Sequence, residues 1–119
     1  MIAREDLKQI IILGYLSDEM LDKLIPIAEL LHFDKRELVY RKGEKAQRFY
    51  MLKEGKVILE QRITDKIAVS LSAVKPGDSF GWSAMLDGEQ YSIDAVCAES
   101  CKVFSFRNEK IKTLFEEDH

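Results

Sequence analysis

Short runs of β-branched and aromatic residues, each ended by a turn signal, constrain the fold of this chain more than any other feature. The runs occupy residues 37–41, 49–53, 57–62, 67–74, 92–97 and 102–106. Gly43, Gly55 and the adjacent Pro76 and Gly77 stand between them, and such residues favour tight turns. Short strands at this spacing predict an antiparallel sandwich or barrel of six to eight strands.

Helical patterns come before the strands. Apolar residues at helical spacing predict a first helix over residues 3–13, with Gly14 as its stop. Ser17 is predicted to cap a second helix, because its side chain can accept a hydrogen bond from a free N–H of the first turn. Pro26 should end or kink that helix, since proline lacks an N–H.

A last helix is predicted to begin at Asn108, with the apolar side chains of Ile111, Leu114 and Phe115 facing inward. The chain has 119 residues, which is the size of one domain. We therefore expect a single domain over residues 1–119 that is mainly β with flanking short helices. Its predicted parts are a helical segment at about 3–28, the strand-rich region at about 29–106 and the final helix at about 108–116.

Charge and hydropathy exclude several classes of protein. The net charge is −3 and the isoelectric point is near 5.4, which argues against direct binding of nucleic acid. The longest apolar run, residues 10–16, is far shorter than the ~20 residues of a membrane-spanning helix. Charged residues near the N-terminus do not fit a secretory signal. We expect a cytoplasmic protein that contacts neither a membrane nor nucleic acid.

Metal, redox and catalytic functions find little support in the sequence. Cys97 and Cys101 are the only cysteines, and the two histidines, His32 and His119, are remote from them, whereas a tetrahedral metal site needs four ligands. A redox pair stays open, but a buried, small apolar role is favoured for Cys97. No motif places a histidine to activate a serine, so we predict no cofactor, no metal and no enzyme activity.

Three glycine-bearing motifs follow one another along the strands. They are Tyr-Arg-Lys-Gly-Glu at 40–44, Phe-Tyr-Met-Leu-Lys-Glu-Gly-Lys-Val at 49–57 and Leu-Ser-Ala-Val-Lys-Pro-Gly-Asp-Ser-Phe-Gly at 71–81. In this order they resemble the cyclic-nucleotide-binding domain family, the sensory β-roll of catabolite-activator-type regulators, cyclic-nucleotide-dependent kinases and gated channels. The likeness runs from about Leu16 to about Phe106, which is most of the chain.

The resemblance implies a jelly-roll-like antiparallel β-roll (a double-stranded β-helix) and a regulatory, small-molecule-sensing role in signal transduction. It also implies a ligand cassette after the third motif, where a short helix faces an anion, a Glu binds the ribose and an Arg pairs with the cyclic phosphate. The helix-turn-helix output domain of the regulators is not expected here, because only 13 residues follow Phe106.

The chain departs from the family pattern at both ligand positions. Trp82 stands at the Glu position and Tyr91 at the Arg position, and a one-residue shift would place Ser92 there instead. The candidate ligand pocket comprises Phe80, Gly81, Trp82, Ser83, Ala84, Tyr91 and Ser92. Trp82 would either stack on a planar ligand or fill the space left by the sugar.

The charge of the cassette also argues against an ordinary cyclic nucleotide site. Residues 76–101 hold five acidic residues and no Lys, Arg or His, so the other 93 residues carry +2. A phosphodiester in a dry pocket without a cation loses several kcal/mol of solvation. We therefore predict a cyclic-nucleotide-binding-like regulatory domain that does not bind cyclic AMP or cyclic GMP in the usual way.

Three alternatives stay open. The altered pocket senses another small molecule or none; the domain binds cyclic nucleotide through a cation from outside the cassette; or it is a protein-interaction domain with a filled pocket. In the last case the six basic residues between positions 35 and 48, otherwise interpreted as a solvated face, could bind a partner. A longer C-terminal helix forms a dimer in the family, so we also expect a weak homodimer or a partner protein through the C-terminal helix.

Overall fold

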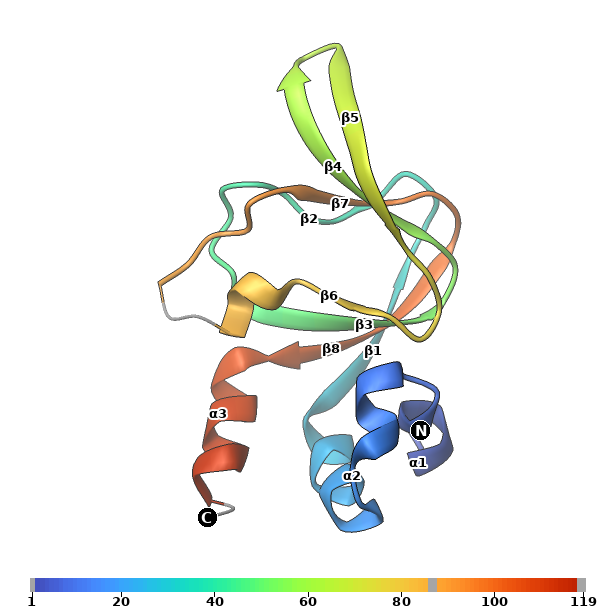
Figure 1. The fold of residues 1–119 in the computed structure, drawn as a ribbon, viewed down its shortest axis with the longest axis vertical. Coiled ribbons are helices and arrows are strands. Elements are labelled where there is room, and N and C mark those ends of the chain that lie inside the picture. The colour runs from blue at the N-terminus through green and yellow to red at the C-terminus, as the bar shows by residue number, and fades with distance from the viewer. Residues whose placement is uncertain (1, 86–87, 118–119) are drawn as a thin grey trace.

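The strands form two antiparallel sheets of four strands each in the computed structural model, which describes residues 2–85 and 88–117 (Figure 1). The strands are β1 (Ala28–Phe33), β2 (Leu38–Tyr40), β3 (Arg48–Glu54), β4 (Val57–Thr64), β5 (Ile67–Val74), β6 (Ser79–Phe80), β7 (Asp94–Cys97) and β8 (Cys101–Arg107). One sheet has the order β1-β8-β3-β6 and the other the order β2-β7-β4-β5. The predicted antiparallel β-roll is confirmed.

Strand pairing is nested around one hairpin. β4 pairs with β5, β3 with β6, β2 with β7 and β1 with β8, so the chain is arranged like a long hairpin that has been rolled up. Further ladders join β3 to β8 and β4 to β7. This nesting brings distant residues into register, and Ala28 lies opposite Phe106.

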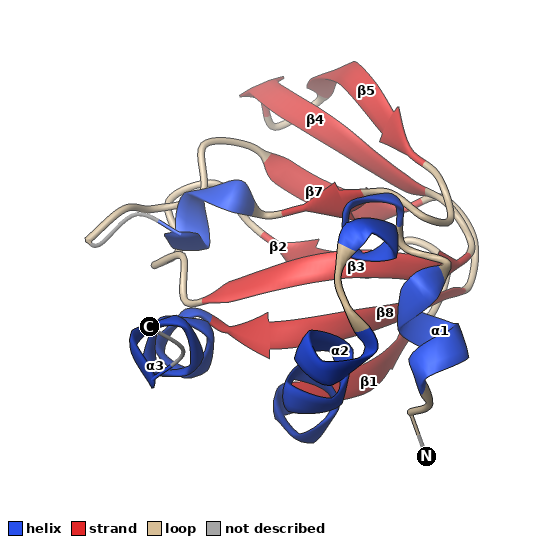
Figure 2. Ribbon diagram, turned by 60° about the horizontal axis from the view of Figure 1, so that its bottom comes forward, coloured by secondary structure: helices blue, strands red, loops and turns tan. Residues whose placement is uncertain are grey.

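Short helices lie beside the sheet that contains β1, β8 and β3 (Figure 2). Within the described residues, none of them is long and apolar enough to cross a membrane. The α-helices are α1 (Arg4–Lys8), α2 (Asp18–Leu24) and α3 (Asn108–Glu117), and the 3₁₀ helices are η1 (Ile11–Tyr15), η2 (Ile25–Ile27) and η3 (Trp82–Met85).

The single helix predicted over residues 3–13 is wrong. The α-helix ends at Lys8 and the chain continues as the 3₁₀ helix η1. The N–H of Ile11 donates a hydrogen bond of 2.8 Å to the carbonyl oxygen of Gly77. This long-range bond replaces the one that a continuous helix would make, and it ties the N-terminal helices to the turn before β6.

The other predicted helix boundaries agree with the structure. The Oγ of Ser17 accepts a hydrogen bond of 3.2 Å from the N–H of Met20, which confirms the N-cap of α2. α2 ends at Leu24, two residues before Pro26. α3 begins at Asn108 with Ile111 buried, whereas the side chain of Phe115 lies outside the described residues.

Two of the eight strands lie outside the six runs that were named from the sequence, within the predicted range of six to eight. β1 directly follows η2 without a turn signal, and as an edge strand paired only with β8 it is at most half-buried. β6 has only two residues, because Gly77 and Gly81 bracket it. Both strands depend on partners that are distant in sequence, and a local pattern does not identify them.

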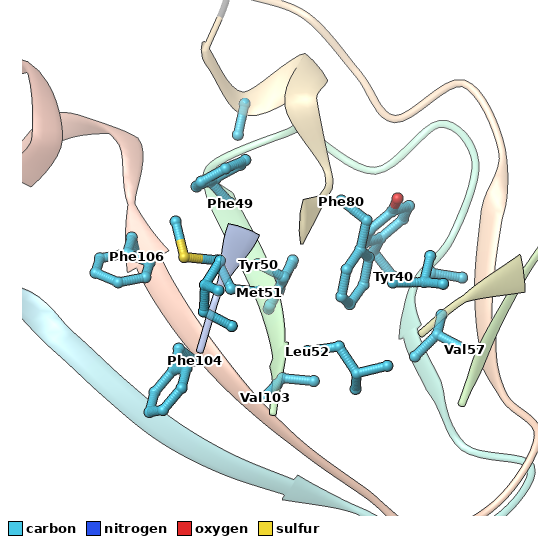
Figure 3. Close-up of a cluster of buried hydrophobic side chains, with 14 of the residues drawn as sticks. Tyr40, Phe49, Tyr50, Met51, Leu52, Val57, Phe80, Val103, Phe104 and Phe106 are labelled. Carbon is cyan, nitrogen blue, oxygen red and sulfur yellow. The ribbon is translucent and has the colours of Figure 1, made fainter. Parts of the chain in front are cut away.

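β3 separates two apolar layers, because successive side chains of a strand point to opposite faces. Phe49 and Met51 face Phe104 and Phe106 on one side, while Tyr50 lies with Tyr40 and Phe80 on the other (Figure 3). The first layer is completed by buried side chains of the N-terminal helices, namely Leu7, Ile10, Leu13, Leu21 and Leu24. The second layer fills the space between the two sheets, beneath the predicted ligand cassette.

We expect Gly55→Ala to lower the free energy of unfolding by about 2–4 kcal/mol. Gly55 has φ +101°, and a Cβ at this position would lie 2.5 Å from the carbonyl oxygen of Ser100 and 2.9 Å from the Cα of Cys101. Backbone atoms would have to move to make room. Urea denaturation measures the loss.

Gly43→Ala is the matched control for this substitution. Gly43 has a similar φ of +91°, but nothing lies within 4 Å of an added Cβ. Only the cost of the left-handed backbone remains, about 1–2 kcal/mol. Equal losses in the two variants would show that close contact at Gly55 is not what requires glycine.

Candidate ligand pocket

The third glycine motif places the cassette against β3. Gly81 turns the chain after β6 with φ +81°. A Cβ at this position would lie 3.2 Å from a ring carbon of Tyr50 and 3.4 Å from the carbonyl oxygen of Arg48. Glycine is therefore required by the close approach as well as by the turn. Ala84 is buried in η3 below it, and its N–H donates to the Gly81 carbonyl oxygen at 3.2 Å.

Tyr91, a predicted pocket residue, is buried and its side chain is held by two hydrogen bonds. Its ring stacks on the ring of Tyr40 with centroids 3.9 Å apart and an angle of 12° between the planes. Its hydroxyl donates to the carbonyl oxygen of Arg48 at 2.5 Å and accepts from the N–H of the same residue at 3.2 Å. The phenol is thus bound to the backbone of β3 and has no charge to offer an anion.

The stack continues through the interior of the roll. The ring centroids of Tyr40 and Tyr50 are 5.9 Å apart. Those of Tyr50 and Phe80 are 5.4 Å apart, with 22° between the ring planes. Burial raises the pKa of the hydroxyls of Tyr40, Tyr50 and Tyr91 above the usual value, so all three stay neutral at physiological pH. An aromatic wall therefore occupies the space under the cassette.

Tyr40 and Tyr50 were not among the predicted pocket residues. A signal existed, because each lies in one of the first two glycine motifs and within a predicted strand run. What the sequence did not reveal is that these two rings would bridge Phe80 to Tyr91.

Trp82 lies on the opposite side of β3, away from this stack. Its side chain is 51% exposed, and its ring packs on that of Phe49 at a centroid distance of 4.4 Å. Phe49 neighbours Tyr50 on β3 and points to the other face, toward the helices. The interpretation that the indole fills the space left by a sugar inside the roll is therefore wrong. Instead it lines an apolar groove with residues of η1, α2 and α3.

The described residues enclose two spaces that Tyr91 lines. A small cavity of about 140 Å³ is lined by Tyr40, Tyr50 and Tyr91 together with Val39, Glu44, Lys45, Gln47 and Arg48. This is below the ~300 Å³ at the lower end of ordinary ligand pockets. A wider surface hollow of about 600 Å³ lies between Lys42 and the loop at 88–92, and the exposed Ser92 lines it.

The basic side chains that line these two spaces come from residues 42–48, outside the cassette. They are Lys42, Lys45 and Arg48. The Arg48 guanidinium is already engaged, because its Nη1 donates to the Oγ of Ser105 at 2.8 Å and lies 3.3 Å from the carboxylate of Glu29. The acidic side chains that the sequence placed in the cassette include Asp87, which lies outside the described residues.

Both cysteines are buried and free. Burial, reinforced by the neighbouring Cys101 thiol, raises the pKa of Cys97 to about 12, so its thiol stays protonated at neutral pH. This environment suits the predicted small apolar role. Among the described residues, no group of three or more His, Cys, Asp or Glu side chains could hold a metal ion.

An antiparallel roll whose sixth strand ends in a glycine turn and a short 3₁₀ helix defines a sensory β-roll of the cyclic-nucleotide-binding type. The family described as the cyclic nucleotide-binding domain matches residues 30–118, and this chain belongs to it. It is 38% identical over 63 residues to the transcriptional regulator LdrP of Thermus thermophilus, covering 53% of this chain and 32% of LdrP. It is 26% identical over 98 residues to human cGMP-dependent protein kinase 2, covering 82% of this chain and 13% of the kinase.

Solved structures share the fold. The sensor domain of the transcriptional regulator DNR from Pseudomonas aeruginosa has a TM-score of 0.82 at 24% identity, over 95% of this chain and 76% of that one. The regulatory domain of Toxoplasma gondii PKA with cAMP has a TM-score of 0.79 at 17% identity, over 93% of this chain and 42% of that one. A regulatory subunit of a cAMP-independent protein kinase A from Trypanosoma brucei has a TM-score of 0.82 at 20% identity, over 94% of this chain and 41% of that one. The fold therefore occurs both in a domain solved with cAMP and in a regulatory subunit of a kinase described as cAMP-independent.

We expect Tyr91→Phe to lower the free energy of unfolding by about 1–2 kcal/mol. The substitution keeps the ring on Tyr40 but leaves the N–H and carbonyl oxygen of Arg48 without their side-chain partner. Tyr15→Phe serves as the control, because Tyr15 is 89% exposed and should change stability by little. Urea unfolding followed by tryptophan fluorescence measures both; equal effects would mean that the Tyr91 hydroxyl does not stabilise the roll.

We expect Trp82→Ala to cost about 1–2 kcal/mol of stability, since half of the indole is already in water. Phe80→Ala, at a site that is 2% exposed, should cost about 3–5 kcal/mol because it opens a cavity in the stack. Circular dichroism in urea provides the comparison. A cost for Trp82→Ala as large as that for Phe80→Ala would place the indole in the core instead.

Proposed function

We propose that this chain is a regulatory domain whose roll is filled by its own aromatic side chains, and that it binds neither cyclic AMP nor cyclic GMP in the usual way. The position of Tyr91 carries this proposal. It stands where the family places the phosphate-binding arginine, and its hydroxyl is used by the backbone of Arg48.

The free-energy cost of placing a cyclic phosphate at Tyr91 supports the proposal. A cyclic phosphate at Tyr91 would lose water and gain no cation from residues 76–101. It would also have to displace Tyr40, whose ring lies 3.9 Å from that of Tyr91. Breaking the stack exposes buried aromatic surface, which adds to the cost.

Regulation would then act through contacts with other protein segments rather than through catalysis. The chain spans about a third of the length of LdrP, a transcriptional regulator, and a smaller share of the kinase that it also matches. We infer that this domain likewise influences an output domain or partner protein and has no catalytic activity of its own.

A second candidate function is a cyclic nucleotide receptor that takes its cation from outside the cassette. The hollow of about 600 Å³ favours it, because Lys42 lies there beside Tyr91 and Ser92. In this arrangement the ligand would sit on the surface of the roll, and Lys42 would meet the phosphate as a single mobile charge.

Isothermal titration calorimetry with cyclic AMP and cyclic GMP tests the proposal. We expect no binding heat with nucleotide at millimolar concentration, because no charge in the cassette offsets the desolvation of the phosphate. Micromolar affinity for either nucleotide would overturn the proposal.

The same titration on variants separates the two candidates. If heat is observed and Lys42→Ala removes it, the second candidate is correct. Lys35→Ala is the matched control, because Lys35 is an exposed basic residue that lines neither space near Tyr91.

A further inference from the structure

The strand β5 lies at the free edge of its sheet. The sheet order is β2-β7-β4-β5, and within the described residues β5 pairs with β4 alone. Seven of its eight residues are exposed, and the hairpin of β4 and β5 projects from the body of the roll (Figure 1). An edge of this kind presents a row of unpaired N–H and C=O groups to any other strand.

The sequence of β5 does little to block such pairing. Natural edges usually carry lysine, proline or inward-pointing charge, whereas Ile67–Val74 contains no charged residue and no proline. Two register irregularities are the edge-blocking devices along the ladder: Leu71 of β5 is skipped between Ser70 and Ser72, and Ile63 of β4 is skipped between Arg62 and Thr64. Ile67, Val69 and Leu71 are 55%, 46% and 57% exposed. Ile67 and Val69 are two positions apart and share one face of the strand, whereas Leu71 is the residue that the ladder skips.

We propose that β5 is a self-association surface, which pairs antiparallel with β5 of a second copy across a two-fold axis at Ser70. The two four-stranded sheets then join into one continuous sheet. This inference goes beyond the proposed function and does not depend on what occupies the roll. α3 is less suited to the role, because Ile111 is buried and Leu114 already packs on the core.

Charge and pattern select this register. With the axis at Ser70, Asp65 in the hairpin turn before β5 of each copy lies near Lys75, directly after β5 of the other, so two attractive pairs flank the uncharged strands. Neither side chain has an ion-pair partner elsewhere in the described part of the chain. Val69 lies opposite Leu71 of the second copy, so exposed apolar side chains of the two strands meet beside the axis.

A shift of the pairing by one residue loses both advantages. Lys66, in the hairpin turn, would then lie near Lys75 of the second copy, and neighbouring like charges are unfavourable. Val69 would face Ser72, so the apolar stripe of one copy would meet the small and polar residues of the other. The register with the two-fold axis at Ser70 is therefore favoured over the register shifted by this one residue.

Sedimentation equilibrium of the full chain from micromolar to millimolar concentration measures the association. We expect a reversible dimer, and Ser70→Lys should weaken it at least about tenfold because two ammonium groups would meet at the axis. Gln61→Lys is the matched control, since it adds the same charge to the same hairpin but on β4, away from the edge. A monomer throughout, or equal weakening by both variants, would overturn the proposal.

Cysteine cross-linking tests the register itself. At the axis, Ser70→Cys brings two thiols onto facing positions, so mild oxidation should give a covalent dimer. In Ala68→Cys the two thiols would lie four residues apart along the strands, about 13 Å, beyond the ~7 Å Cα separation that a disulfide spans. The native cysteines are buried and should not contribute. Cross-linking of Ala68→Cys alone, or none in Ser70→Cys, would contradict the two-fold axis at Ser70.

A charge exchange provides an independent check. Asp65→Lys should weaken the dimer, because the new ammonium group would lie opposite Lys75 of the other copy, and adding Lys75→Asp should restore it. If the double variant stays as weak as the single one, the two residues do not face each other and the register is wrong.

Discussion

The nested pairing of β1 with β8 and of β2 with β7 is the constraint on which the rest of the structure depends. It closes a series of short strands, none stable alone, into a roll with a shared interior. Only the hairpin of β4 and β5 is local, whereas every other pair needs segments that are distant in sequence. The closure carries the C-terminal helix to the side of β3 where the N-terminal helices pack, and it holds the cassette between β6 and β7 over the interior.

β3 then determines what each substituted residue of the cassette can do. Its side chains alternate between the interior of the roll and the helical side, so Tyr50 and Phe49 belong to different apolar layers. Tyr91 joins the inner layer and Trp82 joins the outer one. Two aromatic residues that are close in sequence therefore have separate effects: Tyr91 adds a ring to the stack inside the roll, and Trp82 leaves an exposed apolar surface beside the helices.

Much of the fold could be predicted because its signals are local. Turn residues such as Gly55, the N-cap at Ser17 and the uncharged apolar run of β5 act within a few positions. The first helix was predicted too long because a bond from Ile11 to Gly77 ends it, and β1 was missed because its partner is β8. The candidate site divides in the same way: Tyr91 could be selected as a pocket residue from the sequence, whereas the ring of Tyr40 that stacks on it could not.

The sequence by itself determined the class of fold, the family and the absence of a cation from residues 76–101. These follow from composition, spacing and glycine positions, which need no knowledge of contacts. Only the tertiary structure decided that Tyr40 and Tyr50 complete a stack under the cassette, that Trp82 points away from it, and that β5 is left as a free edge. The physical reason is that side-chain direction and strand order depend on pairing between distant segments, and such pairing is settled by the packing of the whole chain.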